Sequence, residues 1–225
     1  MKKLISYHIR QDTPGWPGNP TYYIESHTSI GGGDSANTFV VHIFNHFGTH
    51  FDAPRHFNGA GATINELPFE LFFYERPLLL DIPKGAGEKV EPKDLILHEA
   101  ALAGCDLLLI RTGFEVYRQK NPALYKMNGP SISSRSAKYL RDNFTGSMKA
   151  VAMDFLSLGA PSDTKDGDLA HRIMLGAFQP GFICIIEDVK MSELEPDKLV
   201  SAAAIPLFFN DIDSGPVTMW AEITE

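Results

Sequence analysis

The chain has 225 residues, of which 44% are hydrophobic, and its formal net charge is −8. This size and composition suffice for one closed core, so we expect a single domain over residues 1–225. The acidic charge without a basic stripe argues against nucleic acid, and the absence of a run of about 18 apolar residues or of a signal-peptide pattern argues against a membrane protein and favours a cytoplasmic location.

Strand-like segments rich in β-branched and aromatic residues recur along the whole chain. They predict strands at residues 3–9, 21–30, 38–45, 77–82, 106–112, 148–153, 181–187 and 216–223. Helix-like patterns are fewer and fall at residues 67–72, 91–103, 133–143 and 171–177, while residues 161–168 have loop composition. Strands that come first and then alternate with helices predict an α/β fold with a mixed sheet.

Four of the eight histidines fall within fifteen residues, together with one aspartate: His42, His46, His50, His56 and Asp52. Positions 42, 46, 50 and 52 share parity, so an extended strand would project these side chains from one face. Imidazole nitrogens and a carboxylate on one face are donors that zinc or manganese accepts. A glycine at position 48 would permit a bulge that brings the two central rings to one ion.

A single histidine on a half-buried strand is more often a hydrogen-bonded structural residue than a metal ligand. This interpretation fits four of the histidines: His8, His27, His42 and His98. The combination of His46, His50 and Asp52 favours a metal site instead, because Asp52 among phenylalanines would otherwise be a poorly solvated charge. His56 follows on a new segment, close enough to act as a proton-transfer group without binding the ion.

The segment HFGTHFDAPRHF, residues 46–57, resembles a known signature, H-x-G-T-H-x-D-x-P-x-H. That signature is typical of the cyclase-like metal hydrolases, the family of bacterial kynurenine formamidase and isatin hydrolase. Further blocks in matching order extend the resemblance over most of the chain: Trp16-Pro17-Gly18, Arg111-Thr112-Gly113, Met153-Asp154 with Ser157, and His171 with Glu187. The chain departs from the family pattern at Asn19, at Asp188, and in an apparent lengthening at Phe178-Gln179-Pro180-Gly181.

The resemblance implies a metal centre of one or two zinc or manganese ions per chain. Its first ion would be bound by His46, His50, Asp52 and Glu187. Asp52 and Glu187 would bridge to a second ion, which His171 would complete. The family fold is a compact α/β unit with a swivelling β/β/α core, and its members commonly form homodimers or homotetramers.

The same resemblance assigns the remaining roles in the site. His56 would be the general acid and base, and Trp16 would lay an aromatic ring on the substrate. The expected reaction is hydrolysis of a small-molecule amide, with N-formylkynurenine as the favoured substrate and an arylformamidase activity. A cyclic amide or imide, as in isatin hydrolase, is the alternative substrate.

Two hypotheses from other classes remain open at this point. His50, Asp52 and His171 would also form the two-histidine, one-carboxylate triad of non-haem iron oxygenases, although that triad leaves His46 and Glu187 unexplained. The chain would alternatively be a metal-stabilised binding protein without catalysis.

Overall fold

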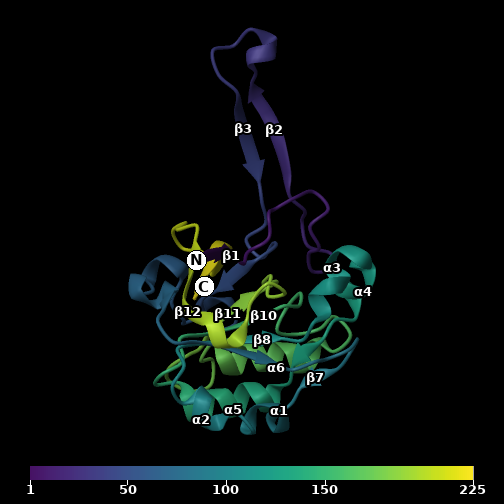
Figure 1. Ribbon diagram of the computed structural model, residues 1–225. Helices are drawn as coiled ribbons and strands as arrows, with labels where there is room; N and C mark the ends of the chain where they lie inside the picture. Colours follow the sequence, from purple (N-terminus) through teal and green to yellow (C-terminus); the bar gives the residue numbers. More distant parts are fainter. Residues whose placement is uncertain (225) are drawn as a thin grey trace.

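A nine-stranded mixed sheet forms the body of the molecule (Figure 1). The computed structural model describes residues 1–224, so Glu225, the last residue of the predicted domain, lies outside the described part. The sheet order is β5 (Phe73–Tyr74), β12 (Leu199–Pro206), β13 (Ser214–Ile223), β4 (His50–Asp52), β11 (Cys184–Glu187), β10 (Ala150–Met153), β8 (Leu107–Arg111) and β6 (Pro77–Asp81), with β1 (Lys2–Leu4) also paired to β13.

The sheet has a parallel half and an antiparallel half. Strands β6, β8, β10 and β11 run parallel to one another. Strand β4 pairs antiparallel with β11 on one side and with β13 on the other, and the pairings of β12 with β13 and β5 are also antiparallel. Since β12 also contacts β6, the two ends of the sheet approach each other as in a nearly closed barrel. The predicted α/β fold with a mixed sheet is confirmed.

Two long helices, α5 (Ser134–Phe144) and α6 (Thr164–Met174), pack against each other beside the parallel half. Each begins at a side-chain cap, because Ser133 accepts a hydrogen bond from the Ser136 amide and Asp163 accepts one from the Asp166 amide. Shorter helices are α1 (Pro92–Ile96), α2 (Glu99–Leu102), α3 (Tyr117–Lys120) and α4 (Pro122–Met127). Within residues 1–224, no helix is long and apolar enough to cross a membrane.

Short 3-10 turns connect several of these elements: η1 (Ile30–Gly32), η2 (Pro54–His56), η3 (Ile64–Glu66), η4 (Phe69–Phe72), η5 (Phe114–Val116) and η6 (Pro196–Lys198). The parallel strands are buried on both faces. Along β8, Leu107 and Leu109 point into one apolar cluster, whereas Leu108 and Ile110 point into the other. This alternation explains why such strands are nearly continuous apolar runs in the sequence.

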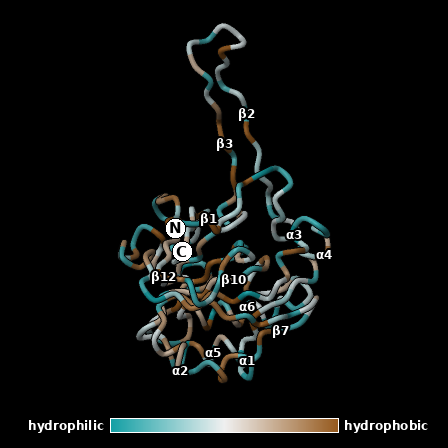
Figure 2. The backbone as a smooth tube through the Cα atoms, viewed as in Figure 1, coloured by the Kyte–Doolittle hydropathy of each residue, from teal (hydrophilic) through white to brown (hydrophobic). Residues whose placement is uncertain are grey.

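A two-stranded hairpin projects from the body as an arm (Figures 1 and 2). It consists of β2 (Tyr23–Thr28) and β3 (Thr38–His42), which pair with each other and with no other strand among residues 1–224. We call residues 23–42 the arm. Several apolar side chains on it are exposed: Tyr23, Ile24, Ile30, Phe39, Val40 and Val41. A further small sheet pairs β7 (Lys89–Val90) with β9 (Ser131–Ile132).

The predicted strand at residues 38–45 is too long, and this changes the histidine cluster. Strand β3 ends at His42, and residues 43–49 carry the chain from the arm into the body without strand structure. Gly48, at φ +66°, lies in the left-handed region and turns the backbone into β4. The prediction that His42 and His46 share a strand face with His50 and Asp52 is therefore wrong, since only the last two lie on one strand.

The predicted helix at residues 171–177 starts and ends too late. Helix α6 includes residues 164–168, which have loop composition, because Asp163 caps its first turn. It ends before Gly176, whose φ of +77° is left-handed. The segment 67–72 contains the 3-10 turn η4 rather than an α-helix, and strands β4 and β12 were not predicted.

Candidate active site

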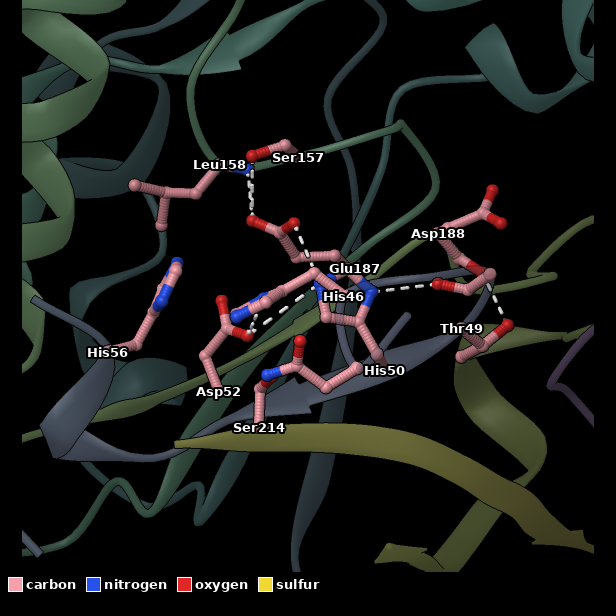
Figure 3. A network of polar contacts seen from close by, with 12 residues as sticks. His46, Thr49, His50, Asp52, His56, Ser157, Leu158, Glu187, Asp188 and Ser214 are labelled. Carbon is pink, nitrogen blue, oxygen red and sulfur yellow. Dashed lines mark hydrogen bonds and ion pairs between the residues drawn. The ribbon is translucent and has the colours of Figure 1, made fainter. Parts of the chain in front are cut away.

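Strand β4 presents two donor side chains to one side of the sheet. Phe51 points into an apolar cluster, so His50 and Asp52, its neighbours on the strand, point to the opposite face. In the antiparallel register with β11, His50 lies directly opposite Glu187. The two side chains meet, with His50 Nε2 3.3 Å from Glu187 Oε2 (Figure 3).

His46 reaches the same place from the irregular segment before β4. Its Nδ1 lies 3.0 Å from Asp52 Oδ1, and its ring centroid is 5.2 Å from that of His50. The left-handed turn at Gly48 allows this approach and also places the Gly48 carbonyl 2.8 Å from His50 Nδ1. The expected backbone irregularity at this glycine is present, as a loop turn rather than a bulge within a strand.

His171 comes from helix α6 and completes the cluster. Its Nε2 lies 3.3 Å from Glu187 Oε1, and its Nδ1 donates to the Gly167 carbonyl at 2.8 Å. The helix approaches the segment before it closely, because a Cβ on Gly159 would lie only 2.9 Å from Gly167 Cα. The Phe178–Gly181 stretch follows the end of α6, so it leaves His171 directed at Glu187.

Each of these histidines has one nitrogen held on the side away from Asp52 and Glu187. His50 and His171 use backbone carbonyls, and His46 Nε2 lies 3.0 Å from a carboxylate oxygen of Asp213. The remaining nitrogens are His46 Nδ1, His50 Nε2 and His171 Nε2, all directed toward Asp52 or Glu187. Outer partners of this kind fix the tautomer and ring orientation of metal-binding histidines.

The cluster contains buried polar atoms that lie close to other charged groups but make no hydrogen bond of good geometry. His50 Nε2 and both carboxylate oxygens of Asp52 are buried and have no hydrogen bond to the described residues. Such groups are costly unless they are satisfied. Ligand atoms of His50, Asp52 and Glu187 lie within 4.8 Å of one another, and so do those of His46, Asp52 and His56. This donor set fits a divalent cation, and Asp52 belongs to both groups.

Electrostatics also adapt the cluster to positive charge. Burial opposes protonation of His46, but the carboxylates of Asp52 and Asp213 outweigh it and raise the pKa of His46 to about 10. Burial would raise the pKa of Glu187, yet contacts with His171 and His50 hold that pKa well below its usual range. Without a metal, the histidine nitrogens therefore tend to hold protons. A cation must displace these protons when it binds, so cation binding releases protons.

A pocket of about 460 Å³ opens above the cluster. It is lined by His46, His50, His171 and Glu187, and also by His56. The pocket has aromatic walls, formed by Trp16, Phe44 and Phe57. Its volume lies in the range of small-molecule sites.

Trp16 and His56 hold different positions in this pocket. Trp16 lines it and also packs against an apolar cluster of Phe114, Tyr125 and Leu156, so it has both a pocket surface and a packing surface. His56, at the end of η2, directs its Nδ1 to Asp213 Oδ2 at 2.8 Å. It belongs to one of the two donor groups, so geometry alone allows either proton transfer or metal binding.

Two residues from the segment after β10 hold Glu187 in place. The Ser157 hydroxyl donates to Glu187 Oε1 at 2.9 Å, and the Leu158 amide donates to the same oxygen at 2.7 Å (Figure 3). In the sequence, Ser157 stands out only as part of a block that resembles the family. Its position explains that block physically, since these bonds orient the other oxygen of Glu187 toward His50.

A buried ion pair next to Glu187 escaped sequence reasoning. Arg118 binds Asp188 through two nitrogens, at 2.8 and 2.7 Å, and the Tyr125 hydroxyl donates to the same carboxylate at 2.6 Å. The Asp188 carbonyl accepts from the Thr49 hydroxyl, which precedes His50. Asp188 has a φ of +55°, so this pair anchors an unusual backbone turn directly behind the site.

Asp213, which contacts both His46 and His56, also escaped sequence reasoning. It lies immediately before β13, whose residue Ser214 pairs with Asp52 in the sheet. A weak signal was available, namely an acidic residue at the start of a strand. Nothing local in the sequence connects that strand with β4.

Comparison with known proteins places this geometry in context. The putative cyclase family profile matches residues 4–160. An uncharacterized protein from Haemophilus influenzae is 42% identical over 119 residues, 53% of this chain and 83% of that protein. A kynurenine formamidase from Maricaulis maris is 29% identical over 214 residues, 95% of this chain and 93% of that enzyme.

Solved structures extend the likeness to the fold of the whole chain. Isatin hydrolase A from Ralstonia solanacearum superposes with a TM-score of 0.81 at 15% identity, covering 100% of this chain and 92% of that structure. An isatin hydrolase bound to the product analogue thioisatinate gives a TM-score of 0.83 at 14% identity, with the same coverage. At this level of identity the likeness concerns the fold.

The fold and the pocket define a protein of mixed α/β architecture with a candidate metal centre. The chain belongs to the putative cyclase family, whose profile matches more than half of its residues. The predicted family membership is thereby confirmed, and with it the general class, a hydrolase of the cyclase family.

Proposed function

We propose that the chain is a metal-dependent amidohydrolase, an arylformamidase that converts N-formylkynurenine to kynurenine and formate. The observation that carries the proposal is the convergence of three histidines and Glu187 on one aromatic-walled pocket, with buried Asp52 beside two of these histidines and a further histidine, His56, also lining the pocket. The formamidase relatives that match over 95% of this chain support the choice of substrate.

The proposed ligands are His46, His50, Asp52, His171 and Glu187. Asp52 and Glu187 each lie beside two of the histidines, so these five side chains would together hold one or two ions of zinc or manganese. When bound, such ions supply an activated water at neutral pH and polarise the substrate carbonyl.

The chain's own residues would orient the substrate and move the proton. Trp16 and Phe57 offer ring faces at the pocket wall for an aryl group. His56 would take a proton from the attacking water and deliver it to the departing nitrogen, a role typically worth about 10² to 10⁴ in rate. The product amine then leaves neutral, while the second proton of the water stays on the carboxyl product and passes to solvent when that product ionises to formate.

A cyclic amide or imide is the second candidate substrate. An aromatic-walled pocket suits a fused ring system as well as an aryl formamide, and ring opening needs the same activated water and proton donor. The oxygenase hypothesis is disfavoured, because His46 and Glu187 join the three residues of its triad in one cluster.

We also propose that two or more copies of the chain associate with one another. The proposed location of the protein is the cytoplasm. The arm exposes Ile24, Phe39 and Val41 on one face, because Ile24 pairs with Val41 and Ser26 with Phe39 in its register. The body exposes Phe69 and Phe208, which contact each other. An isolated two-stranded hairpin is marginal in water, and a two-fold dimer would cover arms and body surfaces reciprocally.

The experiment is hydrolysis of N-formylkynurenine by purified protein loaded with zinc or manganese, with a chelated sample as control. Metal-dependent release of kynurenine is the expected result. Turnover of isatin or another cyclic amide without formamidase activity would replace the first substrate by the second. Turnover that persists in the chelated sample would contradict the metal-dependent mechanism.

A further inference from the structure

Asp213 occupies a position that the proposed metal centre does not account for. Its Oδ2 lies 2.8 Å from His56 Nδ1 and 3.0 Å from His46 Nε2, while its Oδ1 accepts from Asn45 Nδ2 at 2.8 Å. This single carboxylate, one residue before β13, therefore contacts both His46, a proposed ligand, and His56, the proposed acid/base. Asp213 and Asp52 contact different nitrogens of the His46 ring, and Asp213 belongs to neither group of clustered donor atoms.

The contact with His56 determines which ring nitrogen faces the pocket. An ionised carboxylate only accepts hydrogen bonds, so the nitrogen that faces Asp213 carries the hydrogen. A neutral His56 is then protonated at Nδ1, and its Nε2 has a free lone pair. The ring is further restrained by Phe57, edge to face at 4.6 Å, and by the His46 ring at 3.9 Å.

We propose that Asp213 is the positioning residue for His56: it fixes the Nδ1-protonated tautomer and stabilises the ring once Nε2 has accepted a proton. The inference rests on the proposed acid/base role of His56. A proton passes from the attacking water to His56 Nε2 and then from Nε2 to the departing nitrogen as the carbon–nitrogen bond breaks. The Nδ1 hydrogen remains shared with Asp213 throughout.

Asp213→Asn is a sharp test because the orientation of the new amide is predictable. Asn45 donates to the Oδ1 position, so the amide oxygen would lie there and the NH₂ group would face the two histidines. An NH₂ group only donates, so His56 Nδ1 would have to accept and its hydrogen would move to Nε2. The matched control is Asp211→Asn, the same chemical change at an exposed residue two positions away.

The first measurement is nitrogen NMR of the histidine rings in zinc-loaded protein, with the His56→Ala variant assigning the signal. The expected result is an Nδ1-protonated His56 in the unmodified protein and in Asp211→Asn, and an Nε2-protonated ring in Asp213→Asn. An Nε2-protonated His56 in the unmodified protein, or an unchanged tautomer in Asp213→Asn, would overturn the proposal. This measurement does not depend on finding the substrate.

The second measurement separates His56 from His46 as the residue through which Asp213 acts. At saturating zinc, Asp213→Asn should lower kcat for N-formylkynurenine by about 10² to 10⁴, with KM changed by less than about threefold. In a His56→Ala background the same change should cost less than about threefold, since the ring it positions is gone. An equal loss in both backgrounds would mean that Asp213 acts through His46, and the proposal would be wrong.

Discussion

The arm and the segment that follows it are adjacent in sequence but lie in opposite environments. His42 ends the arm, where it stacks on Tyr23 with ring centroids 4.2 Å apart and lies 3.4 Å from the exposed carboxylate of Glu25. His46, four residues later, is largely buried and lies between Asp52 and Asp213. The same side-chain type is thus partly exposed beside a solvated carboxylate in one place and lies between two partly or fully buried carboxylates in the other.

This difference teaches that clustered histidines are not sufficient for a metal site. On the arm, the partners of a histidine come from the neighbouring strand and remain solvated. In the body, the partners of His46 are Asp52 on β4 and Asp213 immediately before β13, and both carboxylates are less exposed than that of Glu25. Beside buried carboxylates, the histidine nitrogens bind a cation more strongly and more selectively. The comparison therefore predicts that substitutions in the buried cluster, and not on the arm, will remove metal.

The largest effect is expected for Asp52→Asn. It retains the shape of the side chain but removes the charge that both donor groups share. Loss of an outer partner of a ligand typically costs about 10 to 100-fold in metal affinity, so loss of a shared ligand should exceed about 100-fold. Metal content by mass spectrometry after gel filtration should fall close to zero, and turnover should fall with it. Full retention of metal would refute the assignment of Asp52.

His56→Ala should come next, with about 10² to 10⁴ lower kcat and unchanged metal content. The distinction matters because His56 also belongs to a group of three clustered donors. Steady-state kinetics and metal analysis on the same preparation check both halves. A variant that loses its metal would make His56 a ligand instead of the acid/base.

Arg118→Met should reduce stability by about 3–5 kcal/mol, because it leaves Asp188 buried without its charge partner. Denaturant unfolding of the metal-free protein measures this. Adding Asp188→Asn should restore much of the loss, since the unpaired charge is then removed. If the single and double variants are equally unstable, the ion pair is not what anchors the turn behind Glu187.

On the arm, Phe39→Ser combined with Val41→Ser should weaken self-association at least about tenfold, because both side chains lie on the proposed contact face and are 56% exposed. Sedimentation over a concentration series measures the change. The matched control is Val40→Ser on the opposite face, which should leave association within about threefold of the unmodified protein. A protein that is monomeric at all concentrations would contradict the proposed use of the arm.

The smallest effect is expected for His42→Ala. Its ring stacks on Tyr23 and lies outside the donor cluster, so metal content should not change and stability should shift by less than about 0.5 kcal/mol. Loss of metal in this variant would remove the contrast between arm and body.

Much of the fold was predictable because buried parallel strands leave a strong local pattern. Strands β6, β8, β10 and β11 and helix α5 all fall within predicted segments or one residue beyond them. The start of α6 was missed because its first turn is polar and stabilised by the Asp163 cap and by Lys89, which pairs with Asp163 and Asp166. Strand β4 was missed because three residues paired on both sides need no long apolar run.

The sequence by itself determined the donor types and the spacing of His46, His50 and Asp52, because a two-residue period on β4 and a glycine turn before it are local properties. The sequence also favoured a structural role for His42, and the family resemblance implied Glu187 as a ligand. Only the tertiary structure decided that Asp213 and the Asp188 ion pair lie beside the cluster. The reason is the sheet order: β4 is inserted between β11 and β13, which follow it by more than 130 residues. Such pairing depends on the packing of the whole core, and no local pattern encodes it.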